Sequence, residues 1–469
     1  MGRHFRIITC IFFLVLTAER AGAQEALVTG RAEGAAGHMI AAGTFSDYIS
    51  GKEIILARGR IDSAGNFSLR IPLKSTSYVW FNIDYYYGEA CLEPGGEYQF
   101  RLCKLVFSDL TDRINHNLQP LVMQVVPDSN DALNLSIQHF NRLTNRFLQD
   151  NLIGFAEKRM RKAIDTLKMK CDTIFADFRN DFFMKYREYR FADLYLMNAQ
   201  SSTSKLFETY LSERRPDYRN IEYMNFFIHF YEDYYMNIGQ GIGVDKYRLI
   251  VNHQASWSAL LDSAGADPQL VNEILREAVM LETLKNLYAA QGFDRKNILH
   301  MLRQAADQTK FEEHRLIANN LMEVLTRFEP GEEAPDFCLP GAGDDTLCLK
   351  QFRGKYVYLH FFTTWNIASL EEMEMMRSLY TKYKGNVSFI SICCDREYMK
   401  MFHFARDHDY PWPLLHFSQD YEFLREWGIA TYPYFILLDP SGRFVAHPAE
   451  SPSMNIEKRL KDVLIGTKE

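Results

Sequence analysis

The sequence is poor in cysteine, with 8 among 469 residues, and none of the cysteine spacings resembles a zinc site. Its 13 histidines are scattered and show no ligand pattern. We therefore predict no metal site and no cofactor.

Strong net charge and long apolar runs are also missing from most of the chain. The net charge is −7 and the charged residues are spread out, which predicts no nucleic-acid partner and no binding to an anionic membrane surface. After the first 23 residues no stretch has the length and apolarity of a membrane helix. The mature chain is therefore expected to lack a membrane span.

The N-terminus has the pattern of a cleavable signal peptide. A basic start, MGRHFR, precedes the apolar run IITCIFFLVLTA, and AGA before Gln24 fits a cleavage site. Cys10 lies inside the apolar run rather than after a small-residue cleavage motif, so no lipid-modified cysteine is expected. We predict that residues 1–23 are a signal peptide and that the protein is exported, to the periplasm in a Gram-negative source.

The remaining chain has the composition of a soluble globular protein. Apolar residues make up 47% and charged residues 24%, and this length predicts roughly two to four domains. Residues 24–108 show alternating runs separated by turns, such as KEIILARGRIDSAGNFSLRI around DSAGN, and two later runs joined by EPGG. We predict a small antiparallel β-sandwich there.

Residues 109–328 change to helical periodicity. Apolar side chains recur at helical spacing in two runs, namely Leu133, Ile137, Phe140, Leu143 and Phe147, then Ile164, Leu167, Cys171, Ile174 and Phe178. This predicts an all-α middle domain. The aromatic segment IEYMNFFIHFYEDYYMN favours core packing over a ligand groove, and Cys171 is expected to be buried.

The segment RFEPGEEAPDF at 327–337 ends the helical pattern with two prolines and a glycine. Beyond it strands and helices alternate: YVYLHFFTTW and VSFISICCD predict strands, SLEEMEMMRSLYTKYKG a helix, and YPYFILLDPSGRFV a hairpin. We predict a multidomain protein whose third domain, residues 329–469, is α/β.

Three ordered segments of this last third resemble the TlpA/ResA-like branch of the thioredoxin superfamily, whose members are usually exported thiol-disulfide proteins. They are GEEAPDF, LKQFRGKYVYLHFFTTW and WGIATYPYFILLDPSG. In the N-terminal part, GNF and EPGGEY resemble landmarks of the β-sandwich that precedes many such domains. The resemblance implies a thioredoxin-like fold for the C-terminal domain.

Family members carry cysteines one and four residues after the tryptophan, and this chain has Asn366 and Ser369 at those positions. The chemistry needs a thiolate at a helix N-terminus and a second thiol that resolves the mixed disulfide. An amide has no ionisable nucleophile, and a hydroxyl forms no stable disulfide. The dithiol cycle is therefore excluded at these positions. Asn366 remains a good helix N-cap, expected to accept a hydrogen bond from the amide of Ala368 or Ser369.

The resemblance also implies that Pro433 is cis and lies beside this helix start, with Tyr432 offering backbone hydrogen bonds to an extended substrate. Two explanations for the proline remain open: it is retained because the substrate groove is retained, or it is retained only because the turn needs its geometry. If the groove is open, Trp365, Asn366, Tyr432 and Pro433 frame a peptide-sized site that uses β-type pairing. We expect His360 to be a packed core histidine and not one that holds a proton near the site.

Other cysteines offer three possible sulfur pairs, of which two are the stronger candidates. Cys338 and Cys348 flank LPGAGDDTL symmetrically, so a hairpin would place them opposite each other, and a structural disulfide and a free pair both remain open. Cys393 and Cys394 are adjacent in a predicted strand and should point to opposite faces, which favours two free thiols.

A further pair, Cys91 and Cys103, flanks EPGG less symmetrically, and a disulfide is less expected there.

These observations favour a non-catalytic binding or scaffold module that engages a peptide or protein partner in the periplasm. The resemblance is to enzymes, but the missing pair favours a protein without that activity. The rival interpretation is a thiol-disulfide oxidoreductase that uses Cys393 and Cys394 or Cys338 and Cys348. A third interpretation makes the last domain a stabilising element for the helical domain, which would hold the ligand site.

Overall fold

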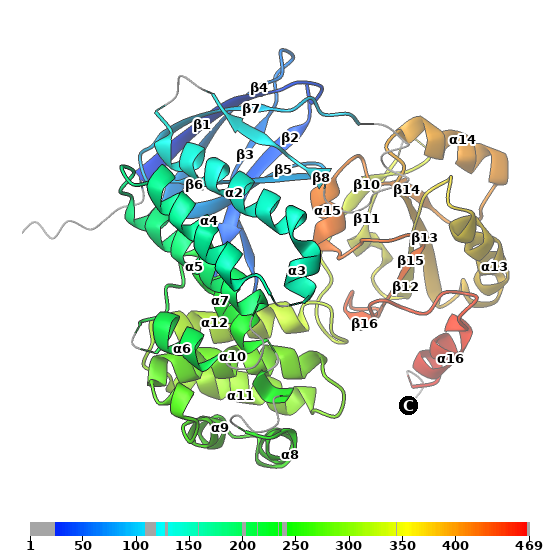
Figure 1. Cartoon of the computed structure of the whole chain (residues 1–469). Helices are drawn as coiled ribbons and strands as arrows, with labels where there is room; N and C mark the ends of the chain where they lie inside the picture. The colour runs from blue at the N-terminus through cyan, green and yellow to red at the C-terminus, as the bar shows by residue number, and fades with distance from the viewer. Residues whose placement is uncertain are drawn as a thin grey trace, which may run out of the picture.

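The computed structural model groups the chain into N-terminal strands, middle helices and a C-terminal α/β unit (Figure 1). It describes residues 24–107, 119–126, 130–157, 159–198, 203–212, 214–232, 234–236, 242–343 and 345–466. The predicted signal peptide, residues 1–23, lies outside the described residues.

The N-terminal strands form two sheets around one apolar core. The strands are β1 (Gln24–Ala32), β2 (Met39–Phe45), β3 (Glu53–Arg60), β4 (Asn66–Leu73), β5 (Ser77–Ile83), β6 (Tyr86–Leu92), β7 (Glu97–Leu102), β8 (Gln119–Pro120) and β9 (Met123–Val125). One sheet has the order β4-β1-β7-β9 and the other β3-β2-β5-β6-β8. Strand β4 alternates strictly between exposed and buried residues, and its buried Leu69 and Ile71 share a cluster with Val79 and Phe81 of β5 in the other sheet.

Two features of these sheets differ from the sequence-based expectation. The pairing is not purely antiparallel, because β1 runs parallel to β7 and β6 runs parallel to β8. Strands β8 and β9 also lie within 109–328, which was expected to be helical. Strands of two and three residues are too short to show a period-2 pattern in sequence.

Helices dominate from Ala132 to Thr326 and lie beneath the sheets in Figure 1. They are α2 (Ala132–Asp150), α3 (Leu152–Ala156), α4 (Arg161–Ile174), α5 (Asp181–Met197), α6 (Ser204–Tyr210), α7 (Ile221–Tyr231), η1 (Tyr234–Met236), α8 (Val244–Arg248), η2 (Leu249–Gln254), α9 (Trp257–Ala264), η3 (Pro268–Leu270), α10 (Glu273–Ala289), α11 (Arg295–Gln308) and α12 (Glu312–Thr326). No helix among the described residues is both long and apolar enough to cross a bilayer.

The predicted apolar faces of these helices are confirmed with one exception. Phe140 and Cys171 are fully buried in the same cluster. Ile174 is 40% exposed, because α4 ends there and the next residue, Phe175, takes the buried position. The aromatic segment beginning at Ile221 packs into a separate core, which confirms core packing.

The C-terminal unit is a five-stranded sheet of order β14-β13-β12-β15-β16 with helices packed on it. Its elements are β10 (Cys338–Pro340), β11 (Thr346–Cys348), η4 (Leu349–Phe352), β12 (Tyr356–Phe362), α13 (Ile367–Tyr383), β13 (Val387–Cys393), α14 (Tyr398–His408), β14 (Leu414–His416), α15 (Tyr421–Glu426), β15 (Tyr434–Leu438), β16 (Phe444–Ala446) and α16 (Ile456–Gly466). Strand β12 is central and every residue in it is buried. The predicted hairpin is confirmed as the antiparallel pair β15 and β16.

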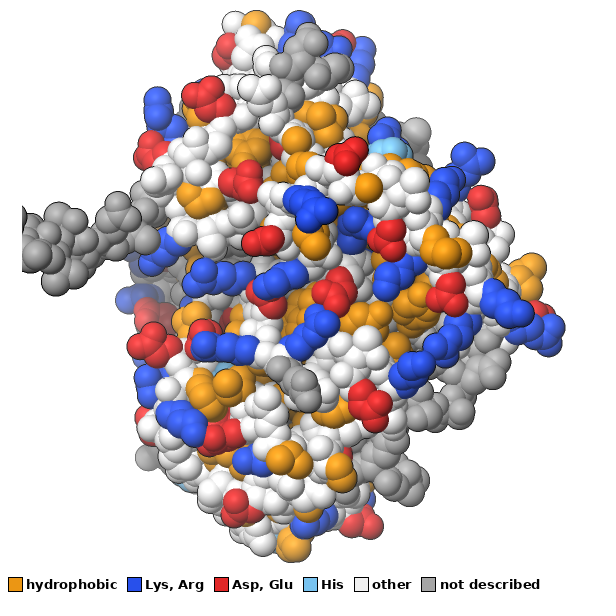
Figure 2. Space-filling view, turned by 60° about the vertical axis from the view of Figure 1, so that its left-hand side comes forward, with side chains coloured by type: hydrophobic (Ala, Val, Ile, Leu, Met, Phe, Trp, Pro, Cys, Tyr) orange, Lys and Arg blue, Asp and Glu red, His pale blue; other side chains and the backbone are white. Residues whose placement is uncertain are grey.

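Polar contacts join the C-terminal unit to the other two groups of elements. Arg396 Nη2 lies 3.4 Å from Asp84 Oδ2, and both side chains are almost fully buried. Arg327, just after α12, donates from Nη2 to the carbonyl of Glu426 at 2.7 Å. On the face in Figure 2, basic and acidic side chains are interspersed, as the modest net charge leads one to expect.

The buried aromatic cluster of the helices gives a stability prediction. Phe140 is fully buried against the rings of Phe175, Phe183 and Phe191. Phe140→Ala should lower the free energy of unfolding of the helices by about 3–5 kcal/mol, because it removes apolar contact and leaves a cavity. Urea denaturation followed by far-UV circular dichroism measures this. Leu152→Ala, at a side chain that is 67% exposed, is the control, and equal shifts for both variants would contradict the packing described.

Candidate functional site

The candidate site lies where the central strand β12 leads into α13. The backbone leaves the buried strand at Phe362, and the amide of Thr364 donates to Asp395 Oδ2 at 2.8 Å. Asp395 follows the neighbouring strand β13 and is 3% exposed. A buried carboxylate therefore fixes the turn that presents Trp365 and Asn366.

Asn366 makes two hydrogen bonds that hold together the start of α13 and the loop that carries Tyr432 and Pro433, which we call the corner. It is the N-cap of α13, and its Oδ1 accepts from the amide of Ser369 at 3.0 Å, one of the two partners expected from the sequence. Its Nδ2 donates to the carbonyl of Tyr432 at 3.2 Å. One neutral side chain thus caps the helix and ties it to the loop that carries Pro433.

Ser369, where the resemblance implies the second cysteine, is fully buried. Ser369 is 0% exposed, and its hydroxyl has no hydrogen-bond partner among the described residues. The same holds for the hydroxyl of Thr363, which is 1% exposed. Neither hydroxyl is in hydrogen-bond contact with a base in the part of the chain that the structure describes.

The loop that faces the helix start has the geometry expected from the resemblance. The Tyr432–Pro433 peptide bond is cis, and both residues are half-buried, as is Trp365. Beside them Ile367, the first residue of α13, is 73% exposed, and Ala368 is also exposed. The structure therefore brings Trp365, Asn366, Tyr432 and Pro433 together at an accessible helix start.

Two charged or titratable residues near the site have structural roles. Glu372 accepts hydrogen bonds from Ser451 Oγ and the amide of Ser453, both at 2.9 Å, so it anchors a loop instead of only complementing the helix dipole. His360 is fully buried and stacks on Phe435 at 4.6 Å. Burial lowers the pKa of His360 to about 3, which keeps this packed histidine neutral.

The adjacent cysteines at the end of β13, Cys393 in the strand and Cys394 just after it, are free thiols in two different cores. Cys393 belongs to the apolar cluster on one face of the sheet and Cys394 to the cluster on the other, as alternation along a strand predicts. Burial raises the pKa of both thiols above the ordinary cysteine value. Cys394 also hydrogen-bonds the hydroxyl of Tyr432, so it lies beneath the cis-proline loop.

The other sulfur pair is a disulfide. Cys338 and Cys348 are direct partners in the antiparallel pair β10 and β11, and their sulfur atoms are bonded. The pair therefore closes the hairpin expected from its symmetric spacing. Cys91 and Cys103 are free thiols, the first buried and the second exposed.

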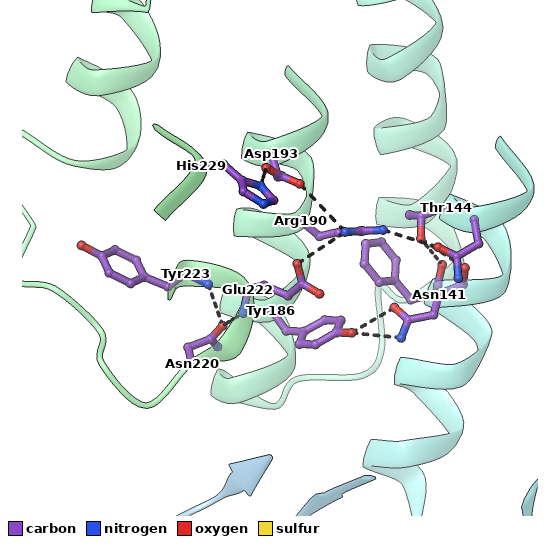
Figure 3. Close-up of polar contacts among 11 residues, drawn as sticks. Asn141, Thr144, Tyr186, Arg190, Asp193, Asn220, Glu222, Tyr223 and His229 are labelled. Atoms are coloured by element: carbon purple, nitrogen blue, oxygen red, sulfur yellow. Dashed lines mark hydrogen bonds and ion pairs between the residues drawn. The ribbon is translucent and has the colours of Figure 1, made fainter. Parts of the chain in front are cut away.

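A second polar cluster lies among the helices and was not found from the sequence (Figure 3). His229 Nδ1 lies 2.9 Å from Asp193 Oδ1, and Arg190 lies between Asp193 and Glu222 with both nitrogen-to-oxygen distances at 3.9 Å. Asp193 and Glu222 are buried, whereas the His229 side chain is 53% exposed. These four residues come from two helices that are distant in sequence, so no local sequence pattern predicted that their side chains would meet. Among the described residues no group of three or more His, Cys, Asp or Glu could hold a metal ion, this cluster included.

Comparisons with known proteins concern the C-terminal unit. Residues 330–447 match the model of the AhpC/TSA family. The thiol-disulfide oxidoreductase ResA of Bacillus thuringiensis is 29% identical over 139 residues, which is 29% of this chain and 80% of that protein. The thioredoxin-like protein YneN of Bacillus subtilis is 25% identical over 130 residues, covering 26% of this chain and 75% of its own length.

Among solved structures, the thioredoxin domain of a thiol-disulfide oxidoreductase from Bacteroides vulgatus is 21% identical. It covers 29% of this chain and 97% of its own, with a TM-score of 0.27. The C-terminal region therefore has a thioredoxin-like fold with homologues among ResA-type thiol-disulfide oxidoreductases.

The double role of Asn366 can be tested by stability. Asn366→Ala removes the cap of α13 and the bond to the Tyr432 carbonyl, and should lower the free energy of unfolding by about 1–2 kcal/mol. Denaturant titration of the full chain measures the change. Ile367→Ala, at the exposed next residue, should change stability by less than about 0.5 kcal/mol. A loss as small for Asn366→Ala as for Ile367→Ala would contradict the role of the amide.

The buried carboxyl of the helical cluster gives a pH prediction. Burial raises the pKa of Glu222 to about 7 from an ordinary value of 4.5, with Arg190 opposing and Asp193 adding to the shift. The folded state thus holds the proton more tightly than the unfolded state, so this group's contribution to stability is complete below about pH 4.5 and is lost as the pH rises through about 7.

Glu222→Gln removes this dependence because the amide does not titrate. The stability of the variant relative to the original protein should therefore rise between pH 5 and pH 8, on the order of 2 kcal/mol. Denaturation midpoints across this pH range measure the difference. A difference that stays flat, or falls with pH, would show that Arg190 compensates the charge fully.

Proposed function

We propose that this chain is an exported protein whose thioredoxin-like unit binds a peptide or protein partner without dithiol catalysis. The proposed architecture is an N-terminal β-sandwich, a helical middle domain and the thioredoxin-like unit. The observation that carries the proposal is the side chain of Asn366, which is engaged through both polar atoms at the position where the resemblance implies the attacking thiol.

The frame around Asn366 supports binding. The Tyr432 carbonyl, which accepts from Asn366 Nδ2, is a backbone group of the kind that lines a site for an extended partner. The exposed side chain of Ile367 adds apolar area at the same place. An extended segment that combines backbone pairing with an apolar side chain is the kind of partner that fits this corner.

The rival function, thiol-disulfide exchange through other cysteines, has weaker support. Cys393 and Cys394 are buried and their raised pKa values disfavour the nucleophilic thiolate. They also lie on opposite faces of the sheet, so they do not form a pair that one substrate disulfide could meet. Cys338 and Cys348 are bonded to each other across the β10–β11 hairpin, where Cys348 is also the N-cap of the short 3-10 helix η4, so neither is a free thiol.

A reduction assay tests the absence of catalysis. The full chain should not accelerate insulin reduction by dithiothreitol, whereas the double variant Asn366→Cys with Ser369→Cys should gain activity, because the helix start and cis loop are retained. Thioredoxin-like rates from the unmodified chain would refute the proposal, and their loss in Cys393→Ser or Cys338→Ser would support the rival.

Binding is tested by photocrosslinking in the producing cells. A benzoylphenylalanine at position 367 should give a defined adduct, and the same probe at Ile153, which is 76% exposed on α3, is the matched control. The adduct at 367 should be lost when Pro433→Ala is added, since the loop that frames the site changes. Identical adducts at 367 and 153, or none at 367, would refute a partner at this corner.

A further inference from the structure

Arg396 lies at the junction between the N-terminal strands and the C-terminal unit. It follows β13 and Asp395, and its side chain is 10% exposed. Its Nη2 lies 3.4 Å from Oδ2 of Asp84, which is between β5 and β6, and it donates to Tyr421 Oη at 3.1 Å at the start of α15. One guanidinium group is therefore bound both by a carboxylate of the N-terminal part and by a hydroxyl of the C-terminal unit.

Three aromatic rings lie against the same guanidinium. Its carbon is 4.7 Å from the ring centre of Phe107, 5.8 Å from that of Tyr421 and 5.9 Å from that of Tyr85. A cation over a ring is attracted by the ring quadrupole, and more strongly where water is excluded. The rings of Tyr85 and Tyr421 also meet edge to face at 5.7 Å. Because the N-terminal part supplies two of the three rings, the full environment of Arg396 exists only when the two parts are docked.

Asp84 is held in position to meet Arg396. His38 Nδ1 lies 2.8 Å from Asp84 Oδ2, and the ring of His38 stacks on that of Phe107 at 4.1 Å. The Asp84 side chain is 8% exposed, so water and salt screen its pair with Arg396 less than they screen a surface pair. The loss of this pair should therefore affect the docking more than the loss of an exposed one.

The residue before Arg396 connects the junction to the corner. Asp395 Oδ2 accepts from the amide of Thr364 at 2.8 Å and so fixes the turn into α13. On the other side of the corner, Tyr432 of the cis-proline loop and Tyr421 pack against one apolar cluster of the C-terminal unit. The helix start is thus held by the immediate neighbour of Arg396, and the loop shares a core with a residue that Arg396 contacts.

A second ion pair at the junction is exposed. Arg58 of β3 and Glu422 of α15 approach with Nε and Oε2 3.1 Å apart, but their side chains are 51% and 38% exposed. Exposed pairs contribute little to stability because water and salt screen them. The buried pair of Asp84 and Arg396 is therefore the stronger attachment, and it is the one beside the corner.

We propose that Arg396 is a positioning residue through which the docked N-terminal part sets the geometry of the corner. Its pairing with Asp84 holds the segment from which Asp395 reaches Thr364, so the turn before Asn366 keeps its place only while the two parts are joined. The consequence for partner binding rests on the proposed function, whereas the effect on the turn does not.

Hydrogen–deuterium exchange of the full chain, followed by mass spectrometry, tests the effect on the turn. Asp84 has φ +52°, a left-handed conformation that Asn tolerates, so Asp84→Asn removes the charge with little change to the backbone. The amides of residues 363–370 should then exchange roughly tenfold faster, because this segment opens locally. Those of residues 387–392 in β13 should exchange as before. An unchanged rate at 363–370, or an equal rise in both segments, would overturn the positioning role.

Two further variants separate positioning from a general loss of charge at the junction. Arg58→Gln breaks the exposed pair and is the matched control, and it should leave exchange at 363–370 unchanged. Arg396→Lys keeps the charge but loses the planar group that lies against the rings, and should raise this exchange roughly threefold. If Asp84→Asn does not fold, Arg396→Lys decides alone, and no rise in it would overturn the proposal.

The crosslinking probe at position 367 tests the consequence for binding. Adding Asp84→Asn should reduce the adduct at least roughly threefold, and adding Arg58→Gln should leave it unchanged. An adduct that both variants leave intact would overturn the link between the junction and the partner. If the parent chain gives no adduct, the proposed function fails, and the exchange rates at 363–370 still decide the role of Arg396.

Discussion

The candidate site depends on one requirement: the free amide groups at the N-terminus of a helix need hydrogen-bond acceptors. The first amides of α13 have no partner within the helix, and they lie at the end of a fully buried central strand where the backbone needs fixed partners. In this chain the carboxamide of Asn366 meets this requirement as the N-cap of α13. Because the same group also donates to the Tyr432 carbonyl, the helix start and the cis-proline loop remain joined without any ionisable atom.

Four cysteines of the C-terminal unit lie in apolar cores or in a hairpin and not at the start of α13. Where thiols remain near the site they are buried in the sheet, one on each face, and burial disfavours their charged form. Where two sulfurs are bonded, in Cys338 and Cys348, they fasten a hairpin. These four cysteines thus serve packing and cross-linking.

Features that depend on neighbouring residues were predictable from the sequence, and features that depend on distant ones were not. The cap by Asn366, the opposite faces of Cys393 and Cys394, and the facing pair Cys338 and Cys348 all follow from local periodicity. The parallel pairing of β1 with β7 joins segments about 70 residues apart, and no local pattern encodes it. The junction of the N-terminal strands with the C-terminal unit depends on contacts such as that of Arg58 with Glu422, separated by 364 positions, and the helical cluster unites residues from separate helices.

One short loop links the candidate site to the rest of the molecule. Asp395 accepts the amide of Thr364 and so fixes the turn before Asn366. The next residue, Arg396, pairs with Asp84 of the N-terminal part and lies over the ring of Phe107 at 4.7 Å. Asp395 therefore faces the candidate site, and the next residue, Arg396, faces the junction with the N-terminal part. Both are held by buried polar contacts, and losing one of these contacts would leave an unpaired charge. Such contacts disfavour independent movement, so the position of the helix start is set by the attachment of the whole unit as well as by its own fold.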